Sequence, residues 1–333
     1  MNSSLAPKVS VCIPVYNGSA YIAESINSVL AQTYEDFHLI VCDNCSTDNT
    51  EEIVRSFRDP RLTYVRNAKN LGLVGNSNRC LDLAKGEYVC ILHHDDVMLP
   101  ENLERKVRLL DERLEVGFVH SNIIVIDSEG EVFAENIWHE DSRRDYIEEG
   151  QTVFRRFLTN LPMGTSIFIG AVLARRSCYE HIGGFSPELP HCTDSEMWMR
   201  MLLFYDVACI GTPLVKYRAH TAAASGSWGD YASFDYLNEH YAAVTMIFEK
   251  YKSHIPNWKG LKNQVSEVFG KRALTLAANA LIKGDFVTYK LFFKEVENIS
   301  PWISKNAILW KTAIGMIVTS GGIKISQALK KIL

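Results

Sequence analysis

The first third of the chain alternates between short apolar runs and segments with the spacing of amphipathic helices. We expect strands at 9–14, 37–42, 62–65 and 88–92. Helices are expected from Ser19, through Ile53 and Phe57, and at 76–84. Repeated units of strand and helix are typical of a mostly parallel sheet with helices on both faces. The predicted fold class is therefore α/β.

Polar residues follow the predicted strands at the points where they end. The clusters are Pro14 to Asn17 at the end of the first strand, with Tyr16 and Asn17 as its polar residues, Asp43 and Asn44 after the second strand, and residues 93–96 after the fourth. Ligands of such sheets bind beyond the carboxyl ends of the strands, so these clusters predict one crevice.

The cluster at 93–96 reads His-His-Asp-Asp. Two adjacent carboxylates repel each other, and a hard cation such as Mg²⁺ or Mn²⁺ relieves that repulsion. The alternative is that Asp96 caps a helix starting near Leu99 and Asp95 is an ordinary turn residue.

Beyond Pro100 the pattern changes. We expect strands at 116–121, 123–126 and 167–173, a turn at 127–130, and a loop or short helices at 135–160. From Phe234 the sequence is helical, with breaks at Pro256 and Pro301. The predicted domains are 1–230, with halves 8–125 and 126–230, and a helical extension at 231–333.

Charge is unevenly distributed, although the net charge is only −4 and favours no nucleic-acid partner. From residue 251 onward there are 13 Lys or Arg and 4 Asp or Glu, a net of +9, so the first 250 residues carry −13. A basic helical tail predicts contact with an anionic membrane surface. A helical cap on the sheet domain, or on a second subunit, is the alternative. The apolar stretch 307–323 is shorter than the about 20 residues of a spanning helix.

Cysteine usage and the N-terminus bear on localisation. Met1 to Lys8 is polar and unlike a secretory signal. The 8 cysteines are scattered, several within apolar strands, which favours a reducing cytoplasm. Cys42 and Cys45 form a lone C-x-x-C, so metal or redox chemistry there is not favoured. We expect a cytoplasmic protein, with a peripheral position on the inner face of the cell membrane as an option.

Eight motifs occur in a familiar order. They are V-S-V-C-I-P-V-Y-N at 9–17, D-N-C-S-T-D-N-T at 43–50, N-L-G at 70–72, A-K-G-E-Y at 84–88, H-H-D-D-V-M-L-P at 93–100, G-G-F at 183–185, T-D-S-E-M-W-M-R at 193–200 and Y-R-A-H at 217–220. With them, residues 8–225 resemble glycosyltransferase family 2, the inverting enzymes with the GT-A fold, as found in bacterial polysaccharide biosynthesis.

The resemblance implies a nucleotide-sugar site. Pro14, Tyr16 and Asn17 would line the base and ribose pocket, and Asp43 would accept a hydrogen bond from N3–H of uracil or thymine, favouring a UDP- or dTDP-sugar. An Asx turn or a helix cap is the alternative for Asp43. The remaining implied donor-binding residues are Asn70, Asn78, His93, His94 and Asp95.

The resemblance also implies a metal and a general base. Asp95 would hold Mg²⁺ or Mn²⁺, with His93 and His220 as further candidate ligands. Asp194 would be the general base, or alternatively would only cap its helix. The chain departs from the family where His93 replaces an Asp and Thr193 a Glu.

Another departure concerns a positive charge. Asn78 stands where many relatives carry an Arg, so a contact to the diphosphate is missing or comes from Arg79. Two smaller alternatives remain open. Trp198 either packs on the face of its own helix or stacks on a sugar. Gly183–Gly184 either caps the C-terminus of a helix or lets the backbone approach the donor sugar closely.

The implied activity is inverting transfer of one sugar to a hydroxyl of a glycan or lipid-linked acceptor. A non-catalytic sugar-nucleotide binder remains an alternative because of the departures from the family pattern. A nucleotidyltransferase is disfavoured, because it needs a Gly-rich basic loop after the first strand and the chain has V-Y-N-G at 15–18. A processive synthase is disfavoured because Q-x-x-R-W is absent from the sequence.

Overall fold

The computed structural model describes residues 6–136, 144–161, 167–189, 192–220 and 233–305. Contacts divide the chain into two compact units, one of 1–154 with 165–228 and the other of 155–164 with 229–333. The domain limits expected from the sequence stay a prediction.

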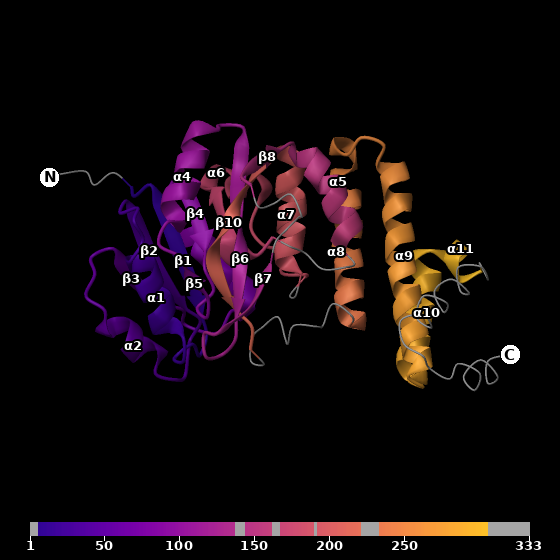
Figure 1. Ribbon diagram of the computed structural model, residues 1–333, viewed down its shortest axis with the longest axis horizontal. Helices are drawn as coiled ribbons and strands as arrows, with labels where there is room; N and C mark the ends of the chain where they lie inside the picture. The colour runs from indigo at the N-terminus through magenta and orange to yellow at the C-terminus, as the bar shows by residue number, and fades with distance from the viewer. Residues whose placement is uncertain (1–5, 137–143, 162–166, 190–191, 221–232, 306–333) are drawn as a thin grey trace. The chain divides into compact units, whose positions relative to one another are not determined.

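Within the described residues, the first unit contains a mixed sheet flanked by helices (Figure 1). The sheet has ten strands, in the main order β3-β2-β1-β4-β9-β6-β10-β5. β7 pairs with β6, and β8 with β10. The strands are β1 (Val9–Val15), β2 (Phe37–Asp43), β3 (Leu62–Arg66), β4 (Tyr88–Ile91), β5 (Val97–Met98), β6 (Val116–Ile126), β7 (Val132–Asn136), β8 (Tyr146–Glu148), β9 (Val172–Arg175) and β10 (Asp206–Arg218).

The predicted parallel arrangement holds for the first four strands, since β1 pairs in parallel with β2 and β4, and β2 with β3. Beyond β4 the sheet is mixed. β9 is antiparallel to both β4 and β6, whereas β6 and β10 are parallel. The carboxyl ends of β1, β2, β3 and β4 therefore meet at one edge.

The helices of the first unit flank this sheet. They are α1 (Ile22–Leu30), α2 (Thr50–Ser56), α3 (Gly72–Leu83), α4 (Asn102–Glu112), α5 (Gly150–Asn160, which ends in the second unit), α6 (Arg176–Ile182) and α7 (Thr193–Phe204), with the 3₁₀ turn η2 (Ile169–Ala171). The second unit contains α8 (Phe234–Tyr251), the 3₁₀ turn η4 (Lys252–His254), α9 (Trp258–Ile282), α10 (Phe286–Ile299) and α11 (Pro301–Ser304).

Alternating side chains of the strands fill a core on each face of the sheet. On one face, Val11 and Ile13 of β1 belong to the same buried cluster as Ile26 of α1, and α4 contributes to it as well. On the other face, the ring of Phe118 stacks on Trp198 of α7 at 5.6 Å, and Trp198 Nε1 donates to the carbonyl of Ile167. Trp198 therefore packs within the core.

Several predicted elements differ in the structure. The two strands expected at 116–121 and 123–126 are one strand, β6. The strand expected at 167–173 begins only at Val172, because η2 occupies 169–171, and β9 continues to Arg175. A Cβ on Gly170 would lie 3.1 Å from Asp96 Oδ2, which shows how closely η2 packs on the 93–96 turn. Residues 135–160 contain β8 and the long helix α5, and α3 begins at Gly72.

The stretch at 307–323 lies outside the described residues. Of the helices that are described, none combines the length and the apolar character needed to span a membrane.

Candidate active site

Asp43 ends β2 and lies between the ends of β1 and β3, because it pairs in register with Val15 and with Arg66. Its side chain has no solvent-exposed surface. Oδ1 accepts the N–H of Ser46 at 2.7 Å, and Oδ2 accepts from the hydroxyl of Tyr64 and from Arg66 at 2.9 Å. One oxygen thus bonds to a backbone N–H three residues further along the chain, while the other is held by a hydroxyl and a guanidinium.

The loop after β1 is tied to the loop after β2. Asn17 has a positive φ of 52°, and its side-chain oxygen accepts the N–H of Thr47 at 2.8 Å. Asp48 accepts from the N–H of Ser19 and from Thr50. Burial of Asp48 opposes ionisation, but the hydrogen bonds from Thr50 and Ser19 lower its pKa to about 2. Asp48 is therefore an anion that fixes both loops.

Pro14 and Tyr16, at the end of β1, differ in their exposure to solvent. Pro14 is buried within β1, whereas the ring of Tyr16 is 46% exposed at the strand end. An exposed aromatic ring at this edge is available for stacking on a planar ligand.

Asn70 belongs to a network of amide side chains. Asn44 Nδ2 donates to Asn70 Oδ1 at 2.8 Å, and Asn70 Oδ1 also accepts the N–H of Gly72. Asn44 Oδ1 accepts from Asn67, which in turn donates to Asn76 at 2.8 Å. The network joins the end of β2 to the start of α3.

The turn at 93–96 is anchored from α1. Ser25 Oγ lies 2.8 Å from the carbonyl oxygen of His94 and 2.6 Å from that of Asp96. A Cβ on Gly18 would lie 2.6 Å from the ring of His94, so His94 packs directly on the loop after β1. Burial lowers the pKa of His94. The loop after β1 and the turn at 93–96 are thus in contact.

The end of β10 holds the two carboxylates of the turn. The N–H of Arg218 donates to Asp96 Oδ1 at 3.0 Å, and its Nε donates to the carbonyl of Asp95 at 2.9 Å. The buried guanidinium also pairs with Glu24. His220 Nε2 lies 3.0 Å from Asp95 Oδ2. The cap considered for Asp96 is wrong, since its carboxylate accepts from β10 instead of from the following helix.

Candidate metal ligands gather here. One donor atom each of His93, Asp95 and Asp96 lie within 4.8 Å of one another. Burial opposes ionisation of Asp95, but nearby His94 and His93 and the hydrogen bond from His220 lower its pKa. Burial and the neighbouring Asp95 raise the pKa of Asp96. An imidazole nitrogen with two carboxylates is a donor set that fits Mn²⁺.

Asp194 lies in the first turn of α7 and is partly buried. Its Oδ1 accepts the N–H of Ser195 at 2.7 Å. Burial raises the pKa of Asp194, while that hydrogen bond and the nearby imidazole of His93 act in the opposite direction. The imidazole of His93 therefore contributes to lowering the pKa of both Asp95 and Asp194.

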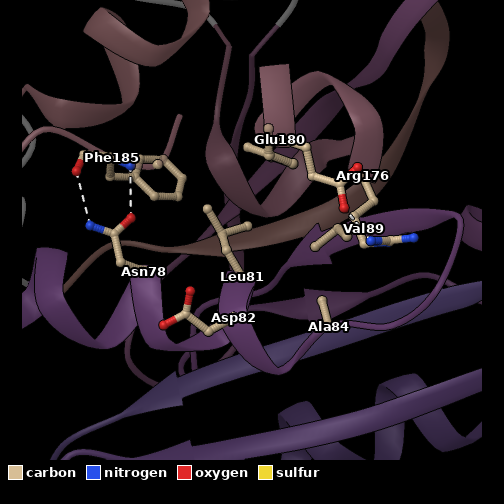
Figure 2. Close-up of a pocket in the computed structure, with 10 residues that line it drawn as sticks. Asn78, Leu81, Asp82, Ala84, Val89, Arg176, Glu180 and Phe185 are labelled. Carbon is tan, nitrogen blue, oxygen red and sulfur yellow. Dashed lines mark hydrogen bonds and ion pairs between the residues drawn. The ribbon is translucent and has the colours of Figure 1, made fainter. Parts of the chain in front are cut away.

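The side chain of Asn78 hydrogen bonds to the turn after α6. Its amide hydrogen bonds to both backbone polar groups of Phe185, at one end of a groove of about 490 Å³ between α3 and α6 (Figure 2). Leu81, Asp82 and Glu180 also line the groove. Gly183 has a φ of +90° and ends α6, which agrees with the helix-cap interpretation.

Sequence reasoning missed Tyr64, Arg66 and Arg218, and it considered Asp96 only as one of two adjacent carboxylates beside a cation. The register of parallel strands provides a signal for Arg66, because a basic residue ending β3 must lie beside an acid ending β2. For Arg218, the sequence provides only its place in Y-R-A-H.

Comparison with known proteins identifies relatives. The sequence model of Glycosyl transferase family 2 matches residues 10–182, which are 173 of the chain's 333 residues. The uncharacterized glycosyltransferase MJ1057 of Methanocaldococcus jannaschii is 29% identical over 217 residues, covering 64% of this chain and 71% of that protein. The Escherichia coli protein named UDP-Glc:alpha-D-GlcNAc-diphosphoundecaprenol beta-1,3-glucosyltransferase WfgD is 27% identical over 221 residues, 66% of this chain and 80% of WfgD.

Solved structures share the fold. TarS of S. aureus in complex with UDP-GlcNAc is 18% identical, with a TM-score of 0.67 over 94% of this chain and 92% of that chain. The mannosyltransferase PcManGT of Pyrobaculum calidifontis, in complex with GDP-Man and Mn²⁺, is 20% identical, with a TM-score of 0.54 over 94% of this chain and 87% of that chain.

Proposed function

The chain belongs to glycosyl transferase family 2 and is a glycosyltransferase with the GT-A fold, and on that premise we propose that it transfers one sugar with inversion from a nucleotide-diphosphate donor. The observation that supports this most is the position of His93. One donor atom each of His93, Asp95 and Asp96 lie within 4.8 Å of one another, and the imidazole of His93 also contributes to lowering the pKa of Asp194, the candidate base.

In this proposal Asp194 is the general base. The acceptor hydroxyl gives its proton to Asp194 while its oxygen bonds to the anomeric carbon, and the bond from that carbon to the diphosphate breaks. Burial raises the pKa of Asp194, and a carboxylate with a raised pKa takes a proton more readily than an ordinary one. No covalent enzyme intermediate is needed.

A divalent cation, Mg²⁺ or Mn²⁺, fits the donor set of His93, Asp95 and Asp96. When bound, it would stabilise the negative charge that develops on the leaving diphosphate. Arg218 and His220 hold Asp96 and Asp95 in place through the contacts described above, so both are proposed to orient the ligands. His220 remains a candidate ligand itself.

For the donor we propose a UDP- or dTDP-sugar. Asp43 would accept from N3–H of the base, and Arg66 and Tyr64 would orient the buried carboxylate. Pro14, Tyr16, Asn17 and Asn70 remain proposed lining residues of this pocket, and His94 remains proposed beside it. The UDP-GlcNAc complex of TarS supports a uridine donor in a chain with this fold.

For the acceptor we propose a glycan or lipid-linked intermediate of surface polysaccharide biosynthesis. The name of WfgD, a relative over 66% of this chain, specifies an acceptor on diphosphoundecaprenol. A peripheral position on the inner face of the cell membrane would bring the enzyme to such an acceptor.

The second unit contains a surface suited to that position. On α10, Val287 is 73% exposed and Leu291 is also exposed, on the side opposite the buried Phe292 and Val296. The same exposed side carries Lys290 and Lys294. Apolar side chains flanked by lysines are typical of helices that lie on anionic lipid.

The test uses the full chain with Mn²⁺ and a panel of nucleotide sugars, first by thermal shift. A matching donor at a hundredfold its Kd should add about 2.7 kcal/mol of apparent stability. Release of nucleoside diphosphate is then measured with GlcNAc-diphosphoundecaprenol as the acceptor. Asp194→Asn should bind the donor normally and transfer at least about 100-fold more slowly. Undiminished transfer by that variant would remove the base assignment, and binding without any transfer would favour a non-catalytic binder.

A flotation assay tests the membrane proposal separately. The full chain should float with vesicles of phosphatidylglycerol and phosphatidylcholine, less so at high salt, and not with phosphatidylcholine alone. Absence of salt-sensitive flotation contradicts docking.

A further inference from the structure

Asn78 of α3 makes a paired contact with a residue 107 positions away in the chain. Its Nδ2 donates to the carbonyl oxygen of Phe185 at 2.9 Å, and its Oδ1 accepts the N–H of Phe185 at 2.7 Å (Figure 2). The amide therefore satisfies both backbone groups of one residue, as a neighbouring strand would. This paired contact between Asn78 and Phe185, here called the latch, joins α3 to the turn after α6.

The latch depends on Gly184. A Cβ at this position would lie 2.4 Å from Asn78 Oδ1, and the three nearest heavy atoms all belong to Asn78. Because nothing else comes so close, the side chain of Asn78 alone excludes a larger residue there.

The other side of the same turn is held by α7. Arg200 donates through Nη1 to the carbonyl of Ile182 at 2.8 Å and through Nη2 to that of Gly184 at 2.7 Å. Glu196 pairs with this guanidinium at 2.7 Å, and both side chains are buried. Asp194 lies in the first turn of the same helix. The position of Asp194 is thus fixed to the turn at 182–185.

On its other side, α3 is fixed to the nucleotide edge of the sheet. Two residues before Asn78, the Nδ2 of Asn76 donates to the carbonyl of Cys42 at 2.9 Å, and Cys42 precedes Asp43 in β2. Helix α3 therefore hydrogen bonds through Asn76 to the strand that carries Asp43, and through Asn78 to the turn that Arg200 ties to the helix of Asp194.

We propose that Asn78 is a positioning residue, which fixes the helix of the general base relative to the donor pocket, and is not a contact to the diphosphate. This inference rests on the proposed function. An amide carries no charge to offset a diphosphate, and its oxygen and one N–H already bond to Phe185. Small errors in the placement of a base are costly to rate while leaving donor binding intact.

The test compares Asn78→Ala, Gly184→Ala and the double variant with a matched control, Asp82→Asn. Asp82 lies one turn further along α3, is exposed, and makes no hydrogen bond or ion pair within the part of the chain that is described. Transfer at saturating donor, the Kd for UDP with Mn²⁺, and hydrogen exchange of the peptide containing Phe185 are measured for each full-length chain.

We expect each single variant to lower kcat about tenfold or more with an unchanged Kd for UDP, and the control to match the wild type. The double variant should be no slower than Asn78→Ala, because the clash of the new Cβ with the amide is gone. Amide exchange at Phe185 should become faster in all three variants and not in the control.

Two results would overturn the assignment. A weaker Kd for UDP in Asn78→Ala with unchanged kcat would make Asn78 a diphosphate contact, and multiplied effects in the double variant would show that the two residues act independently. Failure of the proposed function would look different, because the wild-type chain would then transfer no sugar while exchange at Phe185 still responded to Asn78→Ala.

Discussion

The guanidinium of Arg66 lies 2.9 Å from Oδ2 of Asp43, although the two side chains come from the ends of different strands, β3 and β2. Asp43 is fully buried, while Arg66 remains partly exposed. A buried polar group needs hydrogen-bond partners, and a carboxylate oxygen accepts hydrogen bonds. The pair therefore makes Asp43 suited to select a base that carries a donor.

Replacement of Asp43 by asparagine should reduce discrimination between bases. Wild type should bind UDP at least about tenfold more tightly than CDP, because only uracil offers an N–H at position 3. The amide introduced by Asp43→Asn both donates and accepts, so the ratio of the two dissociation constants should approach one. Calorimetric titration of both nucleotides with Mn²⁺ measures it, and a ratio unchanged by the substitution would contradict base recognition by Asp43.

Ser25→Ala should weaken metal binding without removing a proposed ligand. Ser25 Oγ bonds to the carbonyls of His94 and Asp96, and so fixes the backbone segment that carries the candidate ligands Asp95 and Asp96. Loss of such an outer partner typically costs about 10- to 100-fold in metal affinity. Titration of Mn²⁺ by electron paramagnetic resonance measures the effect.

The matched control for that substitution is Ser56→Ala. Ser56 also donates from a helix to a carbonyl, that of Ile53, but at an exposed site of α2. Its Mn²⁺ affinity should equal that of the wild type, and an equal loss in both variants would show a general effect of removing a helical serine.

Gly18→Ala should disturb the His-His-Asp-Asp turn from the side of the nucleotide loop. The new Cβ would lie 2.6 Å from the ring of His94 and 2.5 Å from Val15, and neither can move without shifting the strand end or the turn. We expect about tenfold or greater loss of transfer, with the chain still folded. A control at the exposed neighbouring position, Ala20→Ser, should have no effect. Full activity of Gly18→Ala would show that His94 has room to move.

The edge of the sheet that carries the site was predictable, because the strand pattern places Asp43 and residues 93–96 at carboxyl ends. Contacts between distant segments were not. Asn78 was expected among the donor-binding residues, with the charged contact to the diphosphate missing or supplied by Arg79, yet its amide bonds to Phe185. Nothing in the local sequence of either residue encodes that pairing, since a polar Asn in a helix has no preferred partner.

The antiparallel strands were also hard to predict. β9 and η2 derive from one apolar run, 167–173, whose hydrophobicity alone does not distinguish a strand from a tight turn packed on Asp96. Arg218 is a similar case, because a basic residue at a strand end is normally expected in solvent, whereas here it is buried against Asp95 and Asp96.

The burial of Lys106 predicts how the free energy of unfolding depends on pH. It is fully buried in α4 and its Nζ donates to the carbonyl of Ala171 at 2.6 Å. Burial lowers the pKa of Lys106 to about 8, from 10.5 in an exposed lysine. Between these two values the unfolded chain binds more protons than the folded one, so the free energy of unfolding should rise with pH. Below about pH 8 the lysine is charged in both states and the full cost of burying the charge applies.

Lys106→Met should therefore flatten that part of the pH profile. The shift corresponds to about 3 kcal/mol across the window from pH 8 to 10.5, and the variant should lack this rise while other titrating groups contribute equally to both chains. At pH 7 the gain from removing the buried charge opposes the cost of about 1–3 kcal/mol for leaving the Ala171 carbonyl unpaired. Urea unfolding at intervals of pH measures the difference between the two chains. Parallel profiles would show that Lys106 is charged throughout and that water or a rearranged carbonyl solvates it.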